Sequence, residues 1–246
     1  MIDVAEPPAD SIIRAIHTGR VTTVLRFLQE NPAIARSFFG SGDPHGAAQT
    51  LLHIATHPPG HYPHCAQTIA ALAAAGAEVN ARCSGEHPET PLHWAASSND
   101  IEALDALLAA GADIEASGGV VDGGTPLADA VGFGQWLAAR DLIDHGARTT
   151  LGGAAAMGLR QRILDCFADG AAPSQEAVNA GFWHACHGGQ FVAALYLFHH
   201  DAEIDWRPQW AGLTALDVAR HARDEHLLTW LQGLGARSAA DLPARP

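Results

Sequence analysis

The sequence has little of what marks β-rich, secreted or membrane proteins. Aromatic residues make up only 7% of its 246 residues, and alternating runs of Val, Ile and Thr are nearly absent, which argues against a sheet as the main architecture. The longest apolar run, residues 69–77, is too short to span a bilayer. The N-terminus lacks the basic flank and apolar run of a signal peptide. We therefore expect a helical, cytoplasmic protein with no membrane partner.

Cysteine is also scarce. The four cysteines, Cys65, Cys83, Cys166 and Cys186, have no spacing typical of a zinc site or a redox pair, and a chain of this size needs no disulfides. The sequence contains no motif for a nucleophile elbow, a phosphate loop or a dinucleotide site. These absences favour reduced, mostly buried thiols and a protein without a cofactor, and they give no support to an enzyme.

Basic residues are outnumbered. There are 27 Asp and Glu against 14 basic residues, so the formal net charge is −13. This balance argues against nucleic acid, whose phosphates would be repelled, and is compatible with a basic partner. The fifteen histidines would offset much of the negative charge in mild acid.

What the sequence does contain is a repeated pattern, clearest in residues 90–111. Around Ala95, a capping residue lies five positions before, an apolar residue three before, a turn residue four after and a Gly sixteen after. Such self-similarity indicates repeated structural units. The pattern recurs, with variations, around seven anchor alanines: Ala15, Ala55, Ala95, Ala130, Ala154, Ala185 and Ala219.

Each copy of the pattern predicts two short helices. Thr at the start caps the first helix, and Pro91 or Pro126 occupies the position where its missing N–H costs nothing. Gly at the end supplies the left-handed residue that terminates the second helix. A single pair of helices cannot bury its apolar face, so neighbouring pairs must stack to form a core.

The segments TLLHIA (residues 50–55), TPLHWA (90–95) and TPLADA (125–130), with the endings GAEVNA and GADIEA, resemble ankyrin repeats. The resemblance extends over about residues 10–236. It implies an all-α ankyrin-repeat solenoid of about seven helix-turn-helix repeats with irregular hairpin fingers. We expect a monomer with one repeat domain at residues 10–236, an N-terminal arm at 1–9 and a C-terminal tail at 237–246.

The resemblance also assigns structural roles. His53 and His93 occupy a position where the family uses His to bond neighbouring backbone or Thr hydroxyl groups. In four other repeats a different residue stands there, and we expect those interfaces to be held by packing instead. These four residues are Ala128, Gly152, Trp183 and Asp217.

The repeats depart from regularity at two places. Between Gly146 and Thr149 only two residues remain where a finger would be expected, so one hairpin is missing. In the second repeat, HPPGHYPHC (residues 57–65) interrupts the helical pair, and its Gly, Pro and His content predicts a loop. We expect this loop to arch over the concave side or edge of the array.

The same loop contains a cluster of metal-competent side chains. His57, His61, His64 and Cys65 lie within nine residues, but their spacing matches no known pair of metal ligands. We interpret them as turn or pocket-lining residues and predict no metal site.

Family geometry places the residue before each anchor, and those two and three after it, in a concave groove. In the fifth repeat the first two of these positions hold the small residues Gly153 and Ala156, which predicts a hollow there. An apolar wall with a few polar groups is typical of a ligand pocket. The predicted binding residues are Trp94, Ser97, Ser98, Asp129, Phe133, His184, His187, His57 and His61.

Three readings of this region stay open. The first is a non-catalytic module whose groove binds a protein or peptide partner. The second is a small-molecule pocket between the third and sixth repeats, in which Asp129 with His184 or His187 performs acid/base catalysis of the isomerase or lyase type. In the third, Gly153 and Ala156 only tighten the stack and leave no cavity.

Overall fold

A computed structural model describes residues 2–4, 9–40, 48–121, 124–168 and 172–243. Parts of the loop at 38–49, of the segment GVVDGG at 119–124 and of both termini lie outside the described residues. The chain divides into two compact units, Met1–Ala147 and Arg148–Pro246. The boundary lies where the sequence lacks a finger. The single-domain limits at residues 10 and 236 stay a prediction.

The expected all-α fold is confirmed. Among the described residues, the helices of unit 1 are α1 (Ala9–His17), α2 (Val21–Glu30), α3 (Leu51–Thr56), α4 (Cys65–Ala74), α5 (Pro91–Ser97), α6 (Ile101–Ala109), α7 (Pro126–Gly132) and α8 (Trp136–Asp144). Those of unit 2 are α9 (Leu151–Ala156), α10 (Arg160–Ala168), α11 (Gln175–His187), α12 (Phe191–Phe198), α13 (Ala215–Ala222) and α14 (Glu225–Gly233). All seven anchor alanines lie in the first helix of a pair and are at most 3% exposed. No described helix has the length and apolar character needed to cross a bilayer.

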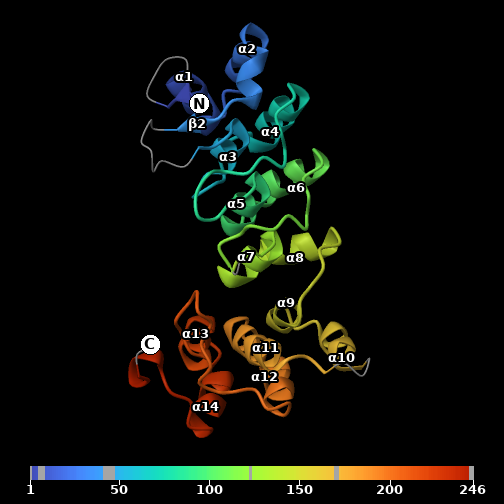
Figure 1. Ribbon diagram of the computed structural model, residues 1–246, viewed down its shortest axis with the longest axis vertical. Helices are drawn as coiled ribbons and strands as arrows, with labels where there is room; N and C mark the ends of the chain where they lie inside the picture. Colours follow the sequence, from blue (N-terminus) through green and yellow to red (C-terminus); the bar gives the residue numbers. More distant parts are fainter. Residues whose placement is uncertain (1, 5–8, 41–47, 122–123, 169–171, 244–246) are drawn as a thin grey trace. The chain divides into compact units, whose positions relative to one another are not determined.

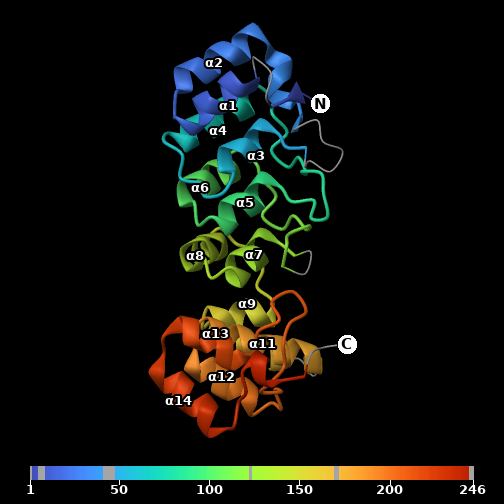
Figure 2. The ribbon, with the colours of Figure 1, turned by 90° about the vertical axis from the view of Figure 1, so that its left-hand side faces the viewer.

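Unit 1 is a stack of four helical pairs in two layers. The first helices α1, α3, α5 and α7 contact one another in order along one layer, and α2, α4, α6 and α8 form the other (Figures 1 and 2). The turn inside each pair needs a left-handed residue. Gly134 adopts a φ of 71° there, and Asn99 adopts 56°, which Asn tolerates better than most residues.

Short segments complete the edge of unit 1. Strand β1 (Ile2–Asp3) pairs in parallel with β2 (Phe39–Gly40), and a 3-10 helix, η1 (Pro32–Arg36), precedes β2. The N-terminal arm therefore adds a strand to the start of the stack, which the sequence did not predict.

The structural role of the two motif histidines is confirmed. In His53, Nδ1 accepts from the Thr50 hydroxyl group at 2.9 Å, and Nε2 lies 3.1 Å from the Glu89 carbonyl oxygen at the base of the next finger. In His93, Nε2 lies 3.2 Å from the Gly124 carbonyl oxygen. Burial lowers the pKa of each imidazole to about 4, so both are neutral donors that tie one repeat to the next.

The expectation that other interfaces are held by packing alone is wrong for two repeats. Trp183 is 2% exposed, and its indole N–H donates to the Leu213 carbonyl oxygen at 2.9 Å. Leu213 directly precedes the cap Thr214, as Glu89 precedes Thr90, so the indole takes over the role of the imidazole. Asp217 accepts from the hydroxyl group of Ser238 and the backbone N–H of Ala239. This holds part of the C-terminal tail, including η2 (Ala239–Asp241), against the last repeat.

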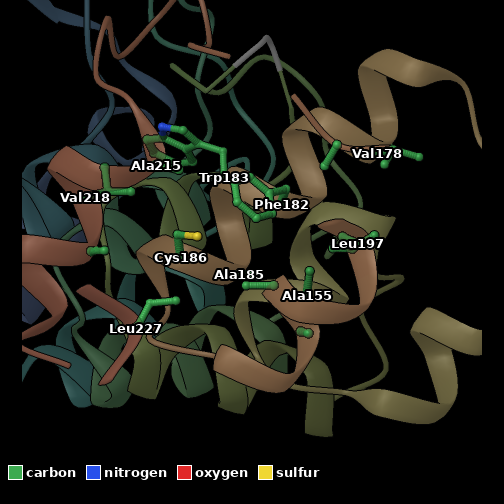
Figure 3. Packing of buried hydrophobic residues seen from close by; sticks show 14 of the residues in the cluster. Ala155, Val178, Phe182, Trp183, Ala185, Cys186, Leu197, Ala215, Val218 and Leu227 are labelled. Atoms are coloured by element: carbon green, nitrogen blue, oxygen red, sulfur yellow. The ribbon is translucent and has the colours of Figure 1, made fainter. Parts of the chain in front are cut away.

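The core of unit 2 is built around α11, which packs between α9 and α13. Phe182 and Trp183 are its largest side chains, and Cys186 is fully buried among alanines and leucines (Figure 3). Small residues allow the close approach of α9, since a Cβ at Gly181 would lie 3.3 Å from Leu151 Cγ.

Candidate functional site

The structure distributes the predicted site residues over the two units. Seven of them lie in unit 1 and two, His184 and His187, lie in unit 2. Asp129 and the two histidines therefore belong to different units, and each is described within its own. The seven residues in unit 1 are His57, His61, Trp94, Ser97, Ser98, Asp129 and Phe133.

Trp94, on α5, is the centre of an aromatic and acidic cluster. Its indole N–H donates to Glu89 Oε2 at 2.9 Å. The imidazoles of His53 and His57 meet its ring edge-on, at centroid distances of 4.9 and 5.4 Å. Two of the predicted binding residues, His57 and Trp94, thus contact each other, and Trp94 is half-buried.

Asp129, on α7, lies fully buried behind this cluster. Its Oδ1 accepts from the Val121 backbone N–H at 2.8 Å, and a Cβ at Gly119 would collide with its carboxylate. Burial raises the pKa of Asp129 to about 7, opposed by the Val121 hydrogen bond and reinforced by the Glu89 carboxylate. Burial raises the pKa of Glu89 as well. The pair therefore holds a proton more tightly than either acid would in water, because two desolvated carboxylates cannot both ionise cheaply.

Sequence reasoning missed Glu89. It stands one residue before the cap Thr90, at the end of a finger, where its backbone carbonyl has a structural role. Its side chain reaches Trp94 on the following helix. An acidic residue at the base of a finger beside a groove aromatic is the signal that could have identified it.

A cleft of about 350 Å³ lies beside the aromatic cluster. His17, Gln49 and His57 are the polar side chains that line it. His17 Nε2 lies 3.3 Å from the Ile54 carbonyl oxygen, and the Tyr62 ring is stacked on His17 with 4.3 Å between ring centroids. Burial lowers the pKa of His17, so the imidazole favours its neutral form. We call this the His57 cleft, since His57 joins it to Trp94. The lining residues are Val4, Ile13, His17, Phe39, Gly40, Gln49, Ile54 and His57.

The inserted loop at residues 57–64, here called the strap, is anchored at two points in unit 1. His61 donates its backbone N–H to Asp100 Oδ2 at 2.5 Å and places Nε2 3.1 Å from the Ser98 carbonyl oxygen. At its other end, Pro63 packs against Gly19, where any Cβ would collide with it. The strap thus runs along the turns of the helical pairs, and His61 is a structural residue of this edge.

Ser97, Ser98 and Phe133 lie at the turn ends of α5 and α7. The Ser97 carbonyl oxygen accepts from the Gln135 side chain at 2.9 Å, and Phe133 is 48% exposed. Both serine hydroxyl groups are buried and have no hydrogen-bond partner among the described residues. Of these three residues, Ser98 contacts the strap, through its carbonyl oxygen and the imidazole of His61.

In unit 2, His184 is wedged into an aromatic cluster. Its ring lies 5.1 Å from Trp183 and 6.3 Å from Trp210, between centroids. A Cβ at Gly152 would lie 2.8 Å from its Cδ2, so the ring occupies the space that this glycine leaves. Burial, with His187 adding to it, lowers the pKa of His184 to about 3. A base this weak accepts a proton poorly at neutral pH, which counts against the acid/base alternative.

The structure defines a protein of stacked helical repeats, with paired helices, Thr caps and side chains that bond the next finger. Comparisons with known proteins indicate the same class of protein. Residues 52–152 match the family model for ankyrin repeats in three copies. Residues 52–152 are therefore ankyrin repeats. Members of this family generally act as protein-interaction modules.

Solved structures support the same fold. The crystal structure of the human ASB11 ankyrin repeat domain aligns with a TM-score of 0.51 at 20% sequence identity, over 97% of this chain and 92% of that one. At this identity the likeness concerns the fold alone. A search of curated proteins gives no significant match.

Proposed function

We propose that unit 1 is a binding module for a basic, extended segment of a partner protein. The segment would lie across the His57 cleft and the Trp94 and Glu89 pair. The observation that carries this proposal is the half-buried indole of Trp94, held by Glu89 and backed by the buried carboxyl group of Asp129. An aromatic face beside a carboxylate suits a guanidinium or ammonium group, which gains from cation–π attraction and charge-assisted hydrogen bonds.

The charge distribution supports a basic partner. Unit 1 contains 17 Asp and Glu against 6 Arg, a formal charge of −11, whereas unit 2 contains 10 against 8. A surface potential of one sign raises the association rate of a partner of the opposite sign. The His57 cleft adds apolar walls that suit one aliphatic or aromatic side chain of the same segment.

The paired acids predict that binding of a cation is coupled to the release of a proton. A cation bound against Glu89 stabilises the ionised forms of Glu89 and Asp129, so binding should release up to about one proton near pH 7. Affinity for a basic peptide should accordingly rise between about pH 6 and 8. This is the sign expected for acids whose pKa is raised in the free protein.

The experiment is peptide selection followed by titration. Random dodecapeptides displayed on phage are selected against the full chain, and the enriched peptides are measured by calorimetry in two buffers of different ionisation enthalpy. We expect enriched peptides to combine Arg or Lys with an apolar residue. Glu89→Gln and Trp94→Ala should each weaken their binding at least tenfold. Glu86→Gln, an exposed acid of the same finger, is the matched control and should leave affinity within about twofold.

Two results would contradict the proposal. One is enrichment of acidic peptides. The other combines two observations. Glu89→Gln leaves the affinity unchanged, and Trp94→Ala lowers the affinity only together with the melting temperature. A monomeric state and a cytoplasmic location stay predictions, tested by light scattering of the purified chain and by imaging of a tagged copy.

A further inference from the structure

Two helices of unit 1 bring three metal-competent side chains together on the layer of second helices. Asp105 lies on α6, Asp141 lies on α8, and His145 caps the C-terminus of α8. One ligand atom from each lies within 4.8 Å of the other two. The groove residues come from first helices, fingers and the strap, so this triad is independent of the proposed function.

The hydrogen bond of the imidazole selects the nitrogen that is free to bind a metal. His145 Nδ1 lies 3.0 Å from the backbone carbonyl oxygen of Asp141. A carbonyl oxygen can only accept, so Nδ1 carries the proton in the neutral ring and Nε2 keeps its lone pair. Nε2 lies 3.7 Å from Asp105 Oδ1. Histidine ligands of metals are commonly oriented in this way, through their other ring N–H.

The carboxylates are poorly compensated without a cation. Asp141 Oδ2 is buried and has no hydrogen-bond partner among the described residues, and only His145 Nδ1, at 3.5 Å, lies within ion-pair range of it. Asp105 and Asp141 both lie within 4 Å of the imidazole of His145, so two carboxylates converge there. A cation between them would offset their mutual repulsion.

We propose that Asp105, Asp141 and His145 bind one divalent transition-metal ion, with Zn²⁺ as the best match. One oxygen from each carboxylate and His145 Nε2 would bind the metal, and water would complete the coordination. For bonds of about 2.1 Å, ligand atoms of a tetrahedral site lie about 3.4 Å apart, close to the 3.7 Å between Nε2 and Asp105 Oδ1. The remaining closure is a rotation of the exposed side chains of Asp105 and His145. One imidazole among oxygen ligands favours Zn²⁺ and its first-row neighbours over Mg²⁺ or Ca²⁺.

Because Asp105 belongs to the third repeat and the other two ligands to the fourth, the ion would cross-link two repeats. Binding to the folded state alone raises stability by mass action. Saturating Zn²⁺ should therefore raise the unfolding midpoint of the full chain, and this rise should be smaller in a variant that lacks a ligand.

The test is calorimetric titration of the metal-stripped full chain with ZnCl₂. Other histidines, including those of the strap, can bind Zn²⁺ weakly, so the readout is the difference between variants. The wild-type chain should bind one equivalent of Zn²⁺. His145→Ala and Asp105→Asn should each abolish this binding or weaken it at least tenfold. Asp144→Asn removes a neighbouring charge without removing a proposed ligand, and it should keep that equivalent. Circular dichroism of each variant verifies that it is folded.

Three outcomes would overturn the proposal: wild type that binds no Zn²⁺ equivalent, variants that bind with wild-type stoichiometry and affinity, or tighter binding of Mg²⁺ or Ca²⁺ than of Zn²⁺ to the triad. Because all three ligands reach the protein surface, the substitutions are compatible with folding, and the two ligand variants provide independent tests.

Discussion

Two neighbouring glycines of α9 offer a test of how the fifth and sixth repeats pack. An added Cβ at Gly152 would lie 2.8 Å from His184 Cδ2, whereas at Gly153 the nearest atoms would be Thr150 Oγ1 at 3.7 Å and Thr149 Cβ at 3.9 Å. Real Cβ contacts as short as the first do not occur without movement. Gly152→Ala and Gly153→Ala therefore add the same methyl group to the same helix. They differ in the atoms that the added methyl group contacts.

The expected magnitudes follow from two opposing terms. Replacing a helical Gly by Ala stabilises a helix by up to about 1 kcal/mol. Overpacking a well-filled core costs about 1 to 3 kcal/mol. His184 cannot easily move, because Trp183 and Trp210 flank its ring. We expect Gly153→Ala to stabilise the chain by about 0.5 to 1 kcal/mol, and Gly152→Ala to be less stable than Gly153→Ala by about 1 to 3 kcal/mol.

Urea unfolding of the full chain, followed by tryptophan fluorescence and far-ultraviolet circular dichroism, measures this difference. The control is the same pair of substitutions in a His184→Ala background. Without the ring, the two variants should agree within about 0.5 kcal/mol. If Gly152→Ala is as stable as Gly153→Ala with His184 present, or if the gap persists without it, the proposed wedge of His184 on Gly152 is wrong.

Three further predictions concern other contacts and are tested by the same unfolding measurement. Trp183→Phe should cost about 1 to 3 kcal/mol, since the buried Leu213 carbonyl loses its donor; a loss below about 0.5 kcal/mol would mean that water replaces the indole. Asp100→Ala should lower the free energy of unfolding by about 2 to 3 kcal/mol, and Asp224→Ala should lower it by about 1 kcal/mol. Both residues cap a helix, but only Asp100 also holds the strap. Equal losses would refute this explanation. Because the pKa of Asp129 is raised in the folded protein, its protonated carboxyl group adds to the free energy of unfolding. This contribution is complete below about pH 4 and is lost as pH rises to about 7. Asp129→Asn should flatten the dependence between these values, and an unchanged pH profile would contradict the assignment.

Much of the fold follows from local patterns in the sequence. The repeats contain Thr caps, anchor alanines and turn residues, which specify helix ends and close contacts within one repeat. These features can therefore be predicted without knowledge of the tertiary structure. Thr90 and His93, for example, lie three residues apart and bond each other at 2.9 Å.

The candidate site depends on contacts that no single repeat specifies. Glu89 and Asp129 lie forty residues apart in the sequence, and their coupling arises because a finger ends beside the next first helix. Asp105 meets Asp141 for a similar reason, on the opposite layer. Periodicity predicts that such positions are neighbours, but it does not predict which side chains turn toward each other.

The histidines show how burial changes an inference from composition. Fifteen imidazoles suggest that mild acid would offset much of the negative charge. Burial lowers the pKa of His53 and His93 to about 4 and that of His184 to about 3, so these three stay neutral until well below pH 6. In the unfolded chain they would be protonated below about 6.5. Stability should therefore fall as pH drops from about 6.5 to 4, because the unfolded state then binds more protons.

One position of the repeat decides whether a side chain ties it to the next repeat. A donor side chain two residues before the anchor binds the carbonyl that precedes the next cap: His53 and His93 do so in unit 1, and Trp183 does so in unit 2. In the fourth and fifth repeats this position holds Ala128 and Gly152, and neither side chain offers a donor. Neighbouring repeats are held by the interface between them. Removing the donor of His53, His93 or Trp183 should therefore weaken the interface that this donor joins.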